Sequence, residues 1–85
     1  MSSEDTFREL DGASVLYGDV VWRLSVWGIH QIGTELWVQM SVAAGAAHHD
    51  LVLHMAHGAR GRDAVASIEA WLESPFPASQ ILHVS

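Results

Sequence analysis

The fold is decided by residues 20–42, VVWRLSVWGIHQIGTELWVQMSV, where apolar side chains recur at every second position on both sides of a glycine-flanked segment. Successive side chains of a β-strand point to opposite faces, so this alternation predicts two half-buried strands. The segment between them, GIHQIG at residues 28–33, predicts the loop of an antiparallel hairpin. The inward positions are then Val20, Trp22, Leu24 and Val26 in the first strand and Leu36, Val38, Met40 and Val42 in the second.

Further elements are indicated on both sides of this hairpin. Residues 13–19 predict a short strand that ends at a Gly-Asp turn, and residues 50–58 alternate again. Apolar residues spaced by three and four over residues 62–73 predict a helix that Pro75 ends. Residues 79–85, SQILHVS, predict a closing strand.

These elements predict a small two-layer α+β fold. We expect a mainly antiparallel sheet of three to four strands, with one main helix at about residues 62–73 on one face, in the order β-β-β-α-β. Residues 1–12 form an N-terminal arm or short helix, and residues 13–85 form a single α+β domain. Strand order stays open, because the place of the last strand depends on the crossover after the helix.

Composition excludes several classes of function. The chain of 85 residues has a formal net charge of −6 and no lysine, so it lacks the basic surface that nucleic acids and anionic membranes require. It has no cysteine, which excludes disulfides and thiol chemistry. No apolar run approaches the length of about 20 residues that a membrane span needs, and the acidic N-terminus lacks a secretory signal. We therefore expect a cytoplasmic protein.

A histidine-rich run, HHDLVLHMAHG at residues 48–58, raises the question of a metal site. In a helix, Asp50, His54 and His57 would share one face as a divalent-metal set. A strand separates them, because side chains alternate and the distance along the strand is too great. The strand is favoured, since the apolar residues would encircle such a helix. Asp50, His54 and His57 are weak metal candidates, and we expect no cofactor.

The sequence pattern predicts no element that would cover the face of the sheet opposite the main helix. In a regular hairpin, Trp27 and Trp37 would lie opposite or diagonal on this face, within contact reach. The N-terminal segment could fold over them, two copies could pair there, or a ligand or partner could bind. His30 and His83 could also converge on His54 across the sheet. The candidate interface or ligand-binding residues are Arg23, Trp27, Trp37, Gln39 and His54.

Two arginines precede the predicted helix in the turn HGARGRD. Arg60 and Arg62 are weak candidates for an anion site, because a helix N-terminus offers free N–H groups. Asp63 is placed to accept the same donors.

The sequence thus predicts a small acidic interaction or binding domain, without specifying its role. About half of its residues are apolar, more than so short a chain can bury alone, so we expect a homodimer formed through the aromatic sheet face. Apart from a second copy of the chain, we expect a different protein or a small apolar ligand to bind this face. One alternative is a small-molecule or divalent-metal binding domain that uses His54 and Asp50 beside Trp27 and Trp37. Another is a small enzyme with its site at a dimer cleft, although no residue set indicates a reaction and no catalytic residue is assigned.

Overall fold

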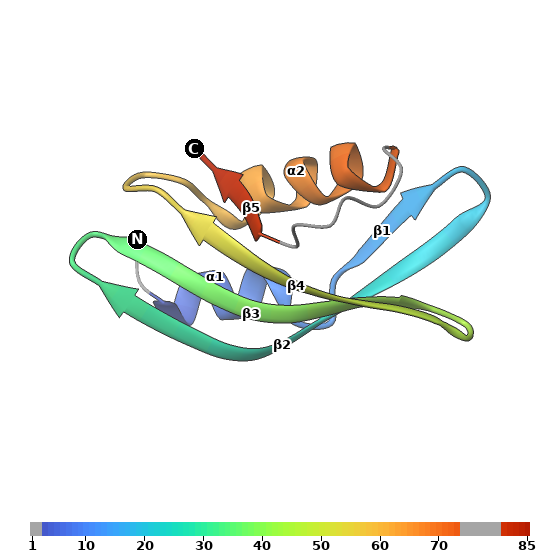
Figure 1. Ribbon diagram of the computed structural model, residues 1–85, viewed down its shortest axis with the longest axis horizontal. Helices are drawn as coiled ribbons and strands as arrows, with labels where there is room; N and C mark the ends of the chain where they lie inside the picture. The colour runs from blue at the N-terminus through green and yellow to red at the C-terminus, as the bar shows by residue number, and fades with distance from the viewer. Residues whose placement is uncertain (1–2, 74–80) are drawn as a thin grey trace.

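The computed structural model of the protein describes residues 3–73 and 81–85, which form one five-stranded sheet and two helices (Figure 1). The α+β class is confirmed, but the expected strand count and order are wrong: the structure has five strands in place of three to four, and the order is α-β-β-β-β-α-β in place of β-β-β-α-β, because a helix and a further strand precede the long hairpin. The elements are α1 (Ser3–Leu10), β1 (Ser14–Tyr17), β2 (Val20–Ile32), β3 (Glu35–Ala44), β4 (Ala47–Met55), α2 (Gly61–Glu73) and β5 (Ile81–Val84).

The strands lie in the order of the sequence, β1-β2-β3-β4-β5. The first three pairings are antiparallel, whereas β5 pairs in parallel with β4 after the chain crosses over through α2. The short strand expected at residues 13–19 is confirmed as β1, and the closing strand lies at β5. The sheet is therefore mixed. Its outermost strands, β1 and β5, have four residues each, and β1 covers only the first four residues of β2.

The predicted hairpin loop at residues 28–33 is wrong. Strand β2 continues to Ile32, and the turn consists of Gly33, with a positive φ of 63°, and Thr34. Gly28, expected to begin the loop, instead pairs within the sheet beside a β-bulge, in which Val26 lies across from Met40 while Gly28 lies across from the next residue, Gln39. The additional residue is Trp27.

This bulge has a side-chain partner from outside the sheet. The Val26 N–H donates to Asp11 Oδ1 at 2.9 Å. A bulge interrupts the regular ladder of hydrogen bonds, and a backbone donor left without an acceptor is costly. Asp11, just after α1, therefore stabilises the irregular point of the longest strand.

A single core fills the space between the sheet and the two helices. Leu10 of α1 and Ile68 of α2 are fully buried there with the inward side chains of β3 and β4. Both helices thus lie on one side, which we call the inner face. The inward positions are confirmed except at the start of β2, where Val20 is 47% exposed and Trp22 is half-buried. The β1–β2 turn extends beyond both helices, which explains this exception (Figure 1).

Helix α1 packs against the first turn of α2. A Cβ atom at Gly61 would lie 2.5 Å from the Cβ of Glu9, so only glycine permits this approach. Because α1 contributes Leu10 to the core, it does not fold over the Trp37 face, one of the alternatives considered. With 8 and 13 residues, the helices described within residues 3–73 and 81–85 are too short and too polar to cross a membrane.

Candidate functional site on the outer sheet face

The outer face, opposite both helices, is the candidate functional surface. Within residues 3–73 and 81–85, no helix packs on it. It exposes large apolar side chains: Leu16, Val21, Ile32 and Ile81 are 66%, 59%, 63% and 45% exposed. Their strand positions and register place all four on this face. Within the described residues, the outer face is therefore apolar in part and has no helix over it, as the sequence predicts.

Four side chains form a line across this face, which we call the histidine row. His30 lies across from Trp37, Trp37 across from His54, and His54 across from His83, so that β2, β3, β4 and β5 each contribute one residue. The sequence indicated only that His30 and His83 could reach His54. The bulge in β2 and the parallel pairing of β5 produce this alignment.

His54 is held on three sides. Its ring stacks on Trp37, with 4.4 Å between ring centroids and 26° between planes. Its Nε2 lies 2.8 Å from Glu35 Oε1, and its Nδ1 lies 3.0 Å from Nδ1 of His83. The side chain is 20% exposed. Contacts on the ring face and at both nitrogens fix the orientation of this imidazole.

The geometry also assigns the protons of the neutral histidine pair. The carboxylate of Glu35 only accepts, so Nε2 of His54 is the donor and carries the proton. Nδ1 of a neutral His54 then has a free lone pair and accepts from Nδ1–H of His83. The outer face thus presents two ring nitrogens that share one proton, an arrangement that can exchange a proton or hold a cation.

Trp27 does not join the histidine row. The prediction that Trp27 and Trp37 lie opposite or diagonal is wrong, because the bulge inserts Trp27 and His30 takes the position across from Trp37. Trp27, 61% exposed, instead lines a groove of about 320 Å³ with Phe7 and Ile29, next to α1. The two tryptophans belong to different surfaces.

Gln39 supports the row from a neighbouring position. Its Oε1 lies 3.1 Å from Nε2 of His30. A Cβ at Gly28, which lies across from Gln39, would come within 2.6 Å of the same oxygen. Glycine next to the bulge therefore leaves room for the amide to reach His30.

Arg23 and Asp50 lie toward the opposite end of the outer face. Arg23 shares a row with Ala43 and His48, far along β2 from His30. Asp50 pairs with His48, with 3.3 Å between Oδ1 and Nε2, and both side chains are largely exposed. Neither residue contributes to the surroundings of His54.

The metal set considered in the sequence is not assembled. Strand β4 places Asp50 and His54 four residues apart along the same face, and His57 follows the end of the strand. Among residues 3–73 and 81–85, no group of three or more histidine, cysteine or acidic residues could hold a metal ion.

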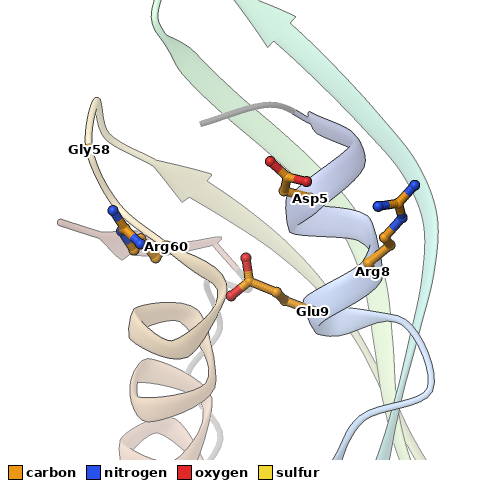
Figure 2. Close-up of a pocket in the computed structure, with 5 residues that line it drawn as sticks. All are labelled: Asp5, Arg8, Glu9, Gly58 and Arg60. Atoms are coloured by element: carbon orange, nitrogen blue, oxygen red, sulfur yellow. The ribbon is translucent and has the colours of Figure 1, made fainter.

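A further cleft lies away from the outer face, between α1 and the loop that follows β4. It measures about 450 Å³ and is lined by Asp5, Arg8, Glu9, Gly58 and Arg60. Figure 2 shows Asp5 and Glu9 projecting from α1 on the side of the loop that carries Arg60, with Arg8 on the other side of the helix. Two carboxylates beside Arg60 make this cleft a poor anion site.

The start of α2 is also occupied by its own acid. The Arg60 N–H donates to Asp63 Oδ2 at 2.8 Å, the reciprocal half of a capping box. Arg62 is exposed and does not line the cleft. The expectation that Asp63 takes a donor at this helix N-terminus is confirmed, and it weakens Arg60 and Arg62 as anion-binding candidates.

No protein-family model, curated protein or solved structure matches the chain. A function is therefore proposed from the geometry of the outer face alone.

Proposed function

We propose that the protein is a small interaction domain that forms a homodimer by packing two outer faces against each other. The observation that carries the proposal is the set of exposed apolar side chains on a face that no described helix covers, with Ile32 and Ile81 toward the Trp37 end and Leu16 and Val21 at the other end. Monomeric proteins rarely expose contiguous apolar surface of this kind, and aromatic residues are enriched in interfaces. A second copy would remove this surface from water.

The size of the face fits such an interface. Five strands spaced by about 4.8 Å span about 19 Å, and nine residues of strand extend about 30 Å. The product is about 600 Å² before side-chain relief is added, and a stable interface buries about 800 Å² on each partner. The projected area is therefore below the typical value, but it exceeds the about 500 Å² per partner that a biological interface should bury.

The charges on the face are self-complementary. Arg23 and Glu35 lie near opposite ends, because Arg23 pairs with Ala43 at the far end of β3 from Glu35. A two-fold axis parallel to the hydrogen bonds of the sheet would place the Arg23 end of each copy over the Glu35 end of the other. Edge-to-edge pairing is disfavoured, because β1 and β5 have only four residues each and the part of β2 that β1 leaves unpaired carries the bulge and lies beside α1.

The test compares two tryptophans that lie on different surfaces. Native mass spectrometry and light scattering should show a dimer for the wild type and a monomer for Trp37→Glu. Trp27→Glu is the matched control, since Trp27 lines the groove beside α1, and it should remain a dimer. Val52→Glu, on the same face but outside the histidine row, should also give a monomer and guards against a folding defect at Trp37.

Three outcomes would contradict the proposal: a wild-type monomer at micromolar concentration, a folded dimeric Val52→Glu variant, or dissociation by Trp27→Glu alone. The last would place the interface in the groove beside α1. A cytoplasmic location belongs to the same proposal, and a chain without cysteine fits that reducing compartment.

A further inference from the structure

We propose that His54 and His83 form a binding site for a late divalent transition-metal ion, with Glu35 as the residue that positions His54. The two Nδ1 atoms would bind the ion directly, and water would complete its coordination. The site is formed by one chain, so this inference goes beyond the proposed homodimer. Because the pair lies on the face that the homodimer would bury, the zinc titration below is made on the monomeric Val52→Glu variant as well as on the wild type, and failure of either proposal can then be recognised separately.

The donor atoms already have nearly the right spacing. Nδ1 of His54 and Nδ1 of His83 lie 3.0 Å apart. Two nitrogens bound tetrahedrally at about 2.0–2.1 Å from zinc are about 3.3–3.4 Å apart. The difference between these two separations is a few tenths of an ångström. A small rotation of the side chains can supply it, particularly at His83, which is exposed.

Glu35 supplies the second feature of a metal-binding histidine. A ligating imidazole usually donates its other ring N–H to a carboxylate or carbonyl, which fixes the tautomer and makes the ligating nitrogen more basic. In this protein, Nε2 of His54 donates to Glu35 at 2.8 Å and leaves Nδ1 as the metal-facing nitrogen. Stacking on Trp37 holds the same ring in place.

The donor types determine the class of ion. Two neutral imidazoles favour zinc, copper or nickel over magnesium and calcium, which prefer oxygen ligands. Only two protein donors meet here, consistent with the absence of any larger group of ligands among residues 3–73 and 81–85. Such an ion keeps open positions, as a site for an exogenous ligand requires.

The experiment is a zinc titration of the full chain in competition with a chromophoric chelator. The wild type should bind zinc, and His83→Ala should bind at least about tenfold more weakly, because loss of a second-shell partner alone typically costs about 10–100-fold. Glu35→Gln, which removes the carboxylate charge but keeps an acceptor, should weaken binding by about tenfold. His30→Ala is the control, since His30 belongs to the row but contacts Gln39 and should leave the affinity unchanged.

A second readout reports the tautomer of His83 by nitrogen-15 NMR of the imidazoles. Without metal, neutral His83 carries its proton on Nδ1 and donates it to His54; with zinc, the proton must lie on Nε2. His54 should keep its Nε2 proton in both states. Equal zinc affinity in wild type and His83→Ala, or an unchanged His83 tautomer at saturating zinc, would overturn the proposal and leave the pair as a hydrogen bond within the sheet.

Discussion

Asp11 provides the sharpest test of how the long β2–β3 hairpin keeps its register. In the Asp11→Ala variant, the Val26 N–H at the bulge loses its acceptor. A hydrogen bond to a charged group contributes about 1.5–3 kcal/mol, and an unsatisfied donor costs about 1–3 kcal/mol. Because Asp11 is exposed and water can reach this site in part, we expect a loss near the lower end, about 1.5 kcal/mol.

Thermal unfolding translates this loss into a measurable shift. In a domain of 60–100 residues, 1 kcal/mol corresponds to about 4–8 °C, so the melting temperature should fall by about 6–12 °C. Asp11→Asn keeps an acceptor oxygen and should lose less. Glu69→Ala, which removes an exposed acid from α2, should stay within about 0.5 kcal/mol of the wild type.

Hydrogen exchange separates the proposed cause from a general loss of charge. The Val26 amide should exchange faster in Asp11→Ala than in the wild type, by more than the change in global stability explains. An unchanged Val26 exchange rate, after correction for global stability, would refute the argument that Asp11 stabilises the bulge. A melting temperature within 2 °C of the wild type would refute its magnitude.

Two further substitutions test the packing of the inner face. Gly61→Ala should lower the free energy of unfolding by about 1–3 kcal/mol, because the new Cβ would lie 2.5 Å from the Cβ of Glu9 and must displace α1. Urea denaturation measures this loss. A Gly61→Ala variant as stable as the wild type would show that α1 docks elsewhere. Leu53→Ala should cost about 2–5 kcal/mol, since Leu53 is fully buried, whereas Ile32→Ala, at a 63% exposed side chain, should cost much less in the same assay. Equal losses at the two positions would contradict the assignment of inner and outer faces.

The sequence predicted the local elements well, because each depends on residues close together in the chain. Alternation in residues 35–42 and 50–55 correctly gave the buried set of β3 and β4, and the spacing of apolar residues gave α2 nearly to the residue. Asp63 was correctly placed as the acid at the start of α2, since a capping contact spans only three residues.

The candidate site was predicted in part. His54, Trp37 and Gln39 were selected from alternation alone, and all three lie on the outer face. Glu35, which the same alternation puts on the outward side of its strand, was not among the candidate residues, because its partner His54 lies 19 residues away in the chain. Trp27 was grouped with Trp37 because a regular register was assumed.

By itself, the sequence determined which segments are strands and helices and which side chains of each strand share a face, since these follow from the periods of the two regular structures. Only the tertiary structure decided which residues meet across the sheet. Because of the bulge at Val26, His30 lies across from Trp37, where a regular ladder would place Ile29. The parallel pairing of β5 with β4 brings His83 beside His54, 29 residues away. Register and strand order depend on packing between distant segments, and one inserted residue changes every later pairing of a strand.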